Sequence, residues 1–306
     1  MLNKCKMFKK IYFEITSACN LSCPFCPPLK RESGFVDEAG FKKVVGEIAG
    51  MTERVLLHVR GEPLLHPEFP RFIRIGQALG VSFEITTNGA LLEGLEDVLL
   101  LPSLVQVNFS LHSLLANGLE NQPLILQKIW DFARRAERER PDLYINFRFW
   151  DMASAVDTPQ NAILEELERM YGFHLTDVNV KRKKSFRLSG RVSLHFDTEF
   201  QWPSMGDAVT GDAGFCYGLK NQIAILSNGV VTPCCLDAEG VICLGNIFHQ
   251  SIAEILESPR ATEIRRNFQA YRLSEALCQR CSYIKRFSPK TLRTQQTGHG
   301  GVLAGV

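Results

Sequence analysis

The chain has 306 residues, 45% of them hydrophobic and 22% charged, and a net charge of +2 from 35 basic and 33 acidic residues. This composition is typical of a globular protein with room for one large and one small domain. The near balance of charge excludes an argument for nucleic-acid or membrane affinity from overall charge, and no window approaches the roughly 18 apolar residues of a membrane span. The basic segment 1–10 lacks a small-residue cleavage signal, so we expect a cytoplasmic protein.

Residues 11–181 alternate short β-rich runs with longer amphipathic stretches, which is the pattern of βα units around a parallel sheet. Six such steps predict an α/β fold with a partial (β/α)6 barrel, whose ligand sites lie at the carboxyl ends of the strands. The expected strands are Ile11–Ile15, Val55–Val59, Ser82–Thr86, Val105–Leu111, Leu143–Phe149 and Asp177–Lys181. The expected helices, whose apolar residues recur at spacings of three and four, are Glu38–Ile48, Phe69–Leu79, Leu92–Leu101, Leu124–Arg138 and Gln160–Tyr171.

The composition of the chain changes after the predicted barrel, which spans 1–181. Residues 182–215 are polar and punctuated by glycine, and we interpret them as a connecting segment. Most of the remaining cysteines lie in 216–290, which predicts a small second domain. The end of the chain, 291–306, has several glycines and no periodicity, so we expect a disordered tail.

Ten cysteines without an export signal are expected to stay reduced, and clustered reduced thiols are more often metal ligands or catalytic groups than disulfide halves. Cys19, Cys23 and Cys26 directly follow the first predicted strand. Three thiolates can wrap one soft-metal centre, whereas structural zinc and a fully protein-bound iron–sulfur cube want four ligands. Three protein ligands therefore leave one coordination position open, and an open position is what a reactive metal site requires. A zinc site completed by a distant residue and packed free thiols are the alternatives.

The spacing of Cys19, Cys23 and Cys26 resembles the CxxxCxxC loop of the radical S-adenosylmethionine (SAM) superfamily. The resemblance implies a 4Fe–4S cluster whose open iron is chelated by SAM. It further implies reductive cleavage of SAM to a 5'-deoxyadenosyl radical that abstracts hydrogen from a substrate, with electrons from a flavodoxin- or ferredoxin-type donor. Phe25 stands where the family usually has an aromatic residue beside the SAM adenine.

Further motifs follow in the order of that family. The segment from Arg60 to Pro63 resembles the GGEP motif that engages the SAM ammonium group, although Arg60 replaces its first glycine. The segment 86–89 resembles the TNG motif. Each alone is typical of a turn, but their order after the cysteine loop supports the resemblance. It assigns adenine, ammonium, ribose and carboxylate contacts of SAM to Phe25, Gly61, Glu62, Pro63, Thr87, Asn88, Ser110 and Arg148.

A second group of cysteines lies in the C-terminal domain, and Gly229 between its first two members predicts a hairpin that brings them together. The pattern resembles the SPASM and Twitch domains of radical SAM enzymes and implies one auxiliary 4Fe–4S cluster, as in the shorter Twitch type. Four thiolates saturate a cube, so this cluster would serve electron transfer or structure; structural zinc is the alternative. The expected ligands are Cys216, Cys234, Cys278 and Cys281.

The resemblance does not identify the substrate or any acid–base residue. An oxidative, dehydrogenase-like reaction on a small molecule and modification of a peptide are the leading hypotheses. RNA modification has weaker support, from the basic run Lys181–Lys184 with Arg187 and Arg191, which also fits a solvated edge. A non-enzymatic zinc or iron–sulfur scaffold is the alternative from another class. We interpret Cys5, Cys235 and Cys243 as packed thiols.

Overall fold

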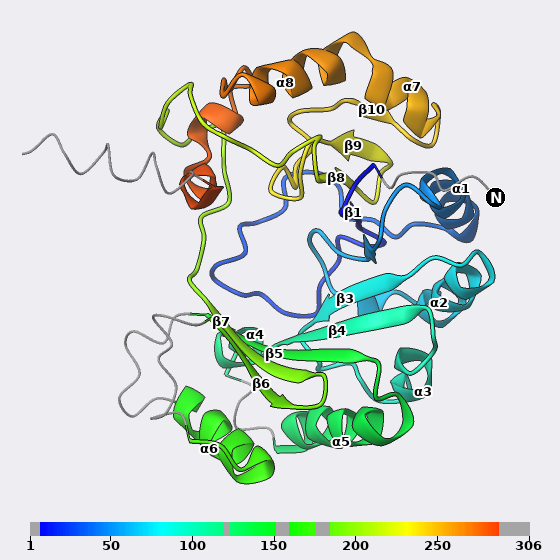
Figure 1. Cartoon of the computed structure of the whole chain (residues 1–306), viewed down its shortest axis with the longest axis vertical. Coiled ribbons are helices and arrows are strands. Elements are labelled where there is room, and N and C mark those ends of the chain that lie inside the picture. The colour runs from blue at the N-terminus through cyan, green and yellow to red at the C-terminus, as the bar shows by residue number, and fades with distance from the viewer. Residues whose placement is uncertain (1–6, 119–122, 151–158, 175–183, 288–306) are drawn as a thin grey trace, which may run out of the picture.

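A computed structural model describes residues 7–118, 123–150, 159–174 and 184–287. Within these ranges, the strands form one ten-stranded sheet in the order β10-β9-β8-β1-β2-β3-β4-β5-β7-β6. Figure 1 shows α7 and α8 beside β8, β9 and β10 at one end of the molecule, and α5 and α6 at the other. No helix among the described residues combines the length and hydrophobicity that crossing a bilayer requires.

Six parallel strands in the described part of the chain form the barrel wall, and five of them lie where the sequence predicts a strand. Its strands are β1 (Lys10–Phe13), β2 (Val55–Leu56), β3 (Phe83–Thr87), β4 (Leu104–Ser110), β5 (Tyr144–Trp150) and β7 (Val192–Asp197). The sheet continues past both ends of this wall. At one end β6 (Ser185–Ser189) lies antiparallel to β7, and at the other β8 (Gln222–Ile225) pairs in parallel with β1 and is followed by the antiparallel strands β9 (Val230–Thr232) and β10 (Gly245–Asn246).

The helices connect the strands. They are α1 (Glu38–Ile48), α2 (Phe69–Ala78), α3 (Glu96–Leu99), α4 (Leu111–Leu115), α5 (Pro123–Glu139), α6 (Pro159–Tyr171), α7 (Ile252–Glu257) and α8 (Pro259–Gln269), with short 3-10 turns η1 (Pro63–Leu65), η3 (Cys278–Arg280) and η4 (Ser282–Phe287). The first helix is capped at its N-terminus by Asp37, whose side chain accepts a hydrogen bond from the N–H of Gly40.

Side chains alternate along each strand between the apolar core on one face of the sheet and a more polar region on the other face. In β3, Phe83 and Ile85 are fully buried against the core, while Glu84 and Thr86 face the other side of the sheet. Helix α2 approaches this strand so closely that a Cβ at Gly76 would lie 1.8 Å from the Phe83 ring. Packing in the core therefore determines which residues of each strand lie on the opposite, more polar face of the sheet.

The sixth parallel position of the wall differs from the sequence prediction. The expected strand Asp177–Lys181 lies outside the described residues, and the strand that pairs in parallel with β5 is β7. The expected connecting segment 182–215 thus contains the β6–β7 hairpin. The sequence carries the signal, because Val192, Leu194 and Phe196 are buried in alternation with polar residues.

The C-terminal cysteine-rich region extends the same sheet, because β8 pairs in parallel with β1. The hairpin predicted around Gly229 is confirmed by the antiparallel pairing of β8 and β9. Gly229 has a φ of +82°, which strongly favours glycine. The sheet therefore joins the two predicted domains directly.

Candidate active site

Both cysteine groups line one cavity of about 950 Å³. The first group stands on the loop after β1. The second group comes from the segment just before β8, the turn after β9 and the region of η3. Every SAM-contact residue expected from the sequence also lines this cavity, except Pro63, which is buried at the start of η1. The thiols that line it are those of Cys19, Cys23, Cys26, Cys216, Cys234, Cys278 and Cys281, and also Cys235.

The first cysteine loop is compact. The N–H of Cys26 donates to the carbonyl of Cys23 at 3.0 Å, and the charges of Cys19, Cys23 and Cys26 interact with one another. Asn117, which the sequence reasoning missed, donates from Nδ2 to Cys23 Sγ at 3.2 Å and accepts from the N–H of Ser22 at 3.1 Å. Thiolates with hydrogen-bond donors aimed at sulfur are a suitable ligand set for an iron–sulfur cluster.

Glu62 connects the turn after β2 to the turn after β3. Its carboxylate accepts hydrogen bonds from the N–H groups of Leu64 at 3.0 Å and Asn88 at 2.8 Å. Burial raises the pKa of Glu62 to about 7, against these hydrogen bonds, which favour the carboxylate. Gly61 must be glycine, because its φ is +77° and a Cβ would lie 2.4 Å from the carbonyl oxygen of Thr16. The segments 60–63 and 86–89, which resemble the two SAM motifs, are thus joined by hydrogen bonds along one edge of the cavity.

An aromatic group surrounds Phe25. Its ring lies 4.5 Å from that of Trp150 and 5.4 Å from that of His112, and the His112 and Trp150 rings are stacked at 4.3 Å. His112 Nδ1 contacts the carbonyl of Arg148 at 3.1 Å. Burial lowers the pKa of His112 to about 4, so the ring is neutral near pH 7. His112, which sequence reasoning did not assign to the site, is therefore part of the cavity wall.

His58 and Tyr12 also line the cavity, and no sequence pattern points to either residue. The two rings meet edge to face at 5.7 Å. His58 Nδ1 is buried without a hydrogen-bond partner in the described part of the chain. Burial, and then the charges of Arg148 and Lys10, lower the pKa of His58 to about 3. The site therefore offers a neutral imidazole with an unused polar atom.

The second cysteine group is held close together. Burial raises the pKa of each of these thiols, and electrostatic interactions link Cys216 and Cys278 to each other and to both Cys234 and Cys281. The N–H of Gly218 donates to Cys216 Sγ at 3.3 Å. No three His, Cys, Asp or Glu side chains in the described ranges surround a single-ion position; the thiols instead stand around the wall of a shared cavity. Their number and type suit a four-thiolate cube.

The cysteines outside both groups differ in position. Cys235 lines the cavity and shares a side-chain hydrogen bond with Tyr12, so it has a contact beyond simple packing. Cys243 is exposed, and Cys5 lies outside the described residues.

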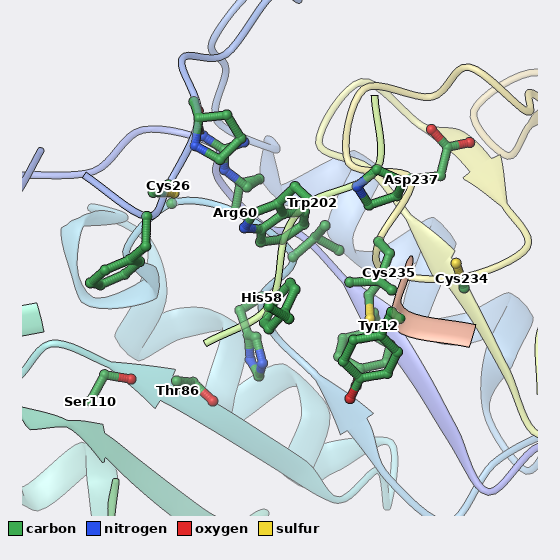
Figure 2. Close-up of a pocket in the computed structure, with 18 of the residues that line it drawn as sticks. Tyr12, Cys26, His58, Arg60, Thr86, Ser110, Trp202, Cys234, Cys235 and Asp237 are labelled. Carbon is green, nitrogen blue, oxygen red and sulfur yellow. Dashed lines mark hydrogen bonds between the residues drawn. The ribbon is translucent and has the colours of Figure 1, made fainter. Parts of the chain in front are cut away.

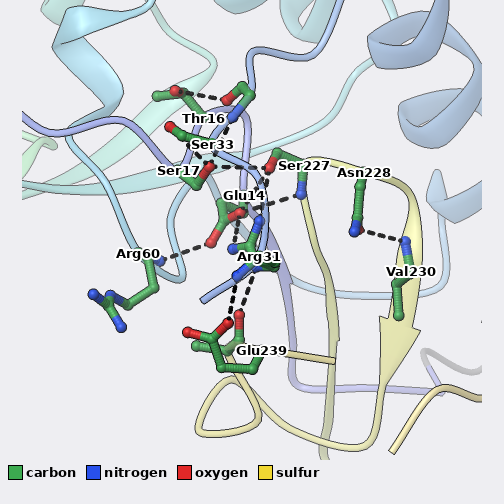
Figure 3. A network of polar contacts seen from close by, with 12 residues as sticks. Glu14, Thr16, Ser17, Arg31, Ser33, Arg60, Ser227, Asn228, Val230 and Glu239 are labelled. Carbon is green, nitrogen blue, oxygen red and sulfur yellow. Dashed lines mark hydrogen bonds and ion pairs between the residues drawn. The ribbon is translucent and has the colours of Figure 1, made fainter. Parts of the chain in front are cut away.

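A buried ion pair joins the first cysteine loop to the C-terminal region (Figure 3). Glu14, which is fully buried, contacts Arg31 Nη2 at 2.5 Å and accepts from Ser227 Oγ at 2.9 Å. Arg31 Nε donates to the carbonyl of Ala238 at 2.8 Å, and the N–H of Arg31 donates to Glu239. Burial raises the pKa of Glu14, and Arg31 opposes the shift. This network holds the two cysteine groups in a fixed relation.

Sequence comparison agrees with this arrangement. The Radical SAM superfamily profile matches residues 13–138, and the SPASM profile, an iron–sulfur cluster-binding domain, matches residues 216–282. A GTP 3',8-cyclase of Chlorobaculum tepidum is 41% identical over 106 residues, which are 33% of this chain and 32% of that protein. An S-adenosyl-L-methionine-dependent 2-deoxy-scyllo-inosamine dehydrogenase of Niallia circulans is 32% identical over 73 residues, 22% of this chain and 29% of that protein. The aligned segments thus span about a third of these relatives or less.

Solved structures show the same fold. The crystal structure of BtrN in complex with AdoMet and 2-DOIA has a TM-score of 0.55 at 18% identity, covering 90% of this chain and 94% of that one. Streptococcus suis SuiB bound to S-adenosylmethionine has a TM-score of 0.51 at 15% identity, covering 93% and 75%. With both domain profiles in the order of the two cysteine groups, the chain belongs to the radical SAM superfamily, carries a SPASM-type iron–sulfur domain, and uses SAM and 4Fe–4S clusters.

Proposed function

We propose that this radical SAM enzyme dehydrogenates a small polar molecule held between its two cysteine groups. The single observation that carries the proposal is that both groups line one cavity of about 950 Å³. The cluster at Cys19, Cys23 and Cys26, when bound, supplies the electron that cleaves SAM to the radical that removes a hydrogen atom from the substrate.

The residues of the chain hold SAM and keep its orientation. Glu62 receives the ammonium group, beside the Gly61 turn, and Asn88 and Thr87 keep the Glu62 carboxylate in place. Phe25 packs on the adenine and Ser110 contacts the ribose. Arg148 lies on the side of the SAM carboxylate, because it is the register partner of Ser110 on the neighbouring strand.

The second cysteine group supports an oxidative outcome of the reaction. After loss of one hydrogen atom, a substrate radical becomes a dehydrogenated product by losing one proton to solvent water and one electron to an acceptor. The four thiolates of this group would close the coordination of a cube, so the cluster that they would hold could take up an electron without binding substrate. Its ligands Cys216, Cys234, Cys278 and Cys281 line the chamber that also holds the SAM residues. The partial likeness to a dehydrogenase is in keeping with this outcome.

The cavity wall favours a small polar substrate. His58 offers an unpartnered ring nitrogen, and Tyr12 offers its hydroxyl beside Lys10 Nζ at 2.7 Å. The rings of Trp150, Phe200 and Trp202 also line the cavity, with successive centroids 5.6 and 5.3 Å apart. We infer an alcohol or amine whose polar group contacts His58 and whose apolar face packs on these rings.

RNA gains no support from the described part of the basic run. Lys184 pairs with Asp197 at 2.6 Å, and Arg191 packs over the Tyr144 ring at 4.4 Å. Residues 181–183 lie outside the described ranges. Peptide modification is distinguished from dehydrogenation of a small molecule by assay.

The test is an anaerobic assay of the reconstituted protein with a flavodoxin- or ferredoxin-type donor. Candidate alcohols, amines and peptides are added in turn, and 5'-deoxyadenosine and product are measured by mass spectrometry. A product two mass units lighter than a small substrate is expected. Turnover of a peptide alone would reassign the substrate class, and a zinc-containing protein that releases no 5'-deoxyadenosine would contradict the proposal.

A further inference from the structure

Arg60 is the residue at which this chain departs from the glycine-rich motif that the neighbouring Gly61, Glu62 and Pro63 resemble. A glycine at that position offers only backbone, whereas Arg60 brings a guanidinium group to the cavity wall. The residue is 9% exposed. A cation placed in so buried a position requires compensation by nearby negative charge or hydrogen bonds.

The guanidinium group lies against the loop that carries Cys26. Arg60 Nη2 donates to the carbonyl of Pro27, the residue directly after Cys26. The side chain of Arg60 also hydrogen-bonds that of Cys26. Figure 2 shows Arg60 beside Cys26 on one side and Trp202 on the other.

Two further contacts fix the position of this side chain. The guanidinium carbon lies 5.3 Å from the centroid of the Trp202 ring, a cation–π distance. The backbone N–H of Arg60 donates to Glu14 Oε2 at 3.0 Å, within the buried network that includes Arg31. Its Nε is buried and has no hydrogen-bond partner among the described residues, so one donor remains unused beside the cysteine loop.

We propose that Arg60 is a positioning residue that raises the reduction potential of the SAM-binding cluster by holding its guanidinium group against Cys26. Reduction adds one electron, taken from an external low-potential donor protein, and no bond is made or broken at Arg60. A fixed positive charge and N–H donors beside a cluster thiolate stabilise the more negative, reduced state. The inference rests on the proposed assignment of Cys19, Cys23 and Cys26 as cluster ligands.

The test is a redox titration of the anaerobically reconstituted holoenzyme without SAM, following the reduced first cluster by electron paramagnetic resonance. The Cys278→Ala/Cys281→Ala background removes the second signal, and iron content is measured on each sample. At a fixed potential, Arg60→Gln should lower the ratio of reduced to oxidised cluster about tenfold, which is ~59 mV for one electron. Arg60→Lys, which keeps the charge without the planar guanidinium group, should have a ratio between those of wild type and Arg60→Gln.

Arg54→Gln is the matched control, since Arg54 also packs over an aromatic ring, Tyr144 at 5.9 Å, but belongs to a different part of the barrel. It should leave the ratio unchanged. If Arg60→Gln fails to retain iron, Trp202→Leu decides, because it releases the guanidinium without altering the cysteine loop and should lower the ratio in the same direction.

Equal midpoint potentials in iron-replete wild type and Arg60→Gln, or in wild type and Trp202→Leu where the first variant loses its cluster, would overturn the inference. The proposed function would then still stand on SAM cleavage by the wild type. A wild type that assembles no first cluster would instead contradict the proposed function itself.

Discussion

A side-chain hydrogen bond joins Tyr12, on the first barrel strand, to Cys235, the residue directly after Cys234. Lys10 Nζ donates to the same Tyr12 hydroxyl at 2.7 Å. Adjacent cysteines therefore have different surroundings. Both interact electrostatically with thiols of the second group, but Cys235 also has a side-chain hydrogen bond to a barrel residue.

This difference predicts different effects on iron content. Wild type should carry about eight irons, as expected for two cubes. Cys234→Ser should lose about half of them, because a ligand of the second cluster is removed, whereas Cys235→Ser should keep the full amount. Iron and labile sulfide analysis of anaerobically purified protein measures both. Loss of iron in Cys235→Ser with retention in Cys234→Ser would exchange the two assignments.

Glu62 should make SAM binding depend on pH. Burial raises the pKa of Glu62 to about 7, while the SAM ammonium favours the carboxylate, so SAM affinity should rise from about pH 6 and level off above about pH 7. Without SAM, this group lowers stability as pH rises from about 4.5 to about 7, because only the folded chain still binds the proton.

The matched variant is Glu62→Gln, which keeps the shape but not the charge. It should bind SAM about tenfold more weakly or worse, with little pH dependence, because a charge-assisted hydrogen bond is lost. Equilibrium dialysis at several pH values measures the affinity, and iron analysis checks that both clusters remain. Unchanged affinity would remove Glu62 from the SAM site.

The division of labour between the clusters predicts a split phenotype. Replacing Cys278 and Cys281 by Ala should abolish substrate turnover but spare dithionite-driven SAM cleavage, because the first cysteine group is untouched. Product and 5'-deoxyadenosine are measured on the same sample, and circular dichroism checks folding, since a cluster also stabilises its domain. Full turnover by a folded double mutant would assign the second cluster a structural role only.

His58 should contribute to substrate binding and not to SAM cleavage. His58→Phe keeps the ring packing but removes the hydrogen-bonding nitrogen atoms, so kcat/KM should fall about tenfold, the size of one lost hydrogen bond of about 1.4 kcal/mol. His249→Phe, at an exposed position, is the control. Steady-state kinetics with the identified substrate provides the measurement. Equal kinetics in both variants would place the substrate away from His58.

Several features of this protein follow from the sequence alone. The spacing of Cys19, Cys23 and Cys26 directly after an apolar strand predicts the first cysteine loop, and Gly229 predicts the β8–β9 hairpin. The helix α1 begins and ends as its periodicity predicts. These features depend on contacts among neighbouring residues, so a short window of sequence contains the information that determines them.

Tertiary structure decided which distant segments meet. Pairing of β8 with β1 places both cysteine groups on one cavity. Pairing of β7 with β5 completes the wall with a strand from the segment that the sequence predicts to be a connection. His58 and Asn117 belong to the site only because of this packing. Strand order and side-chain packing arise from long-range burial of apolar surface, which leaves no fixed spacing in the sequence.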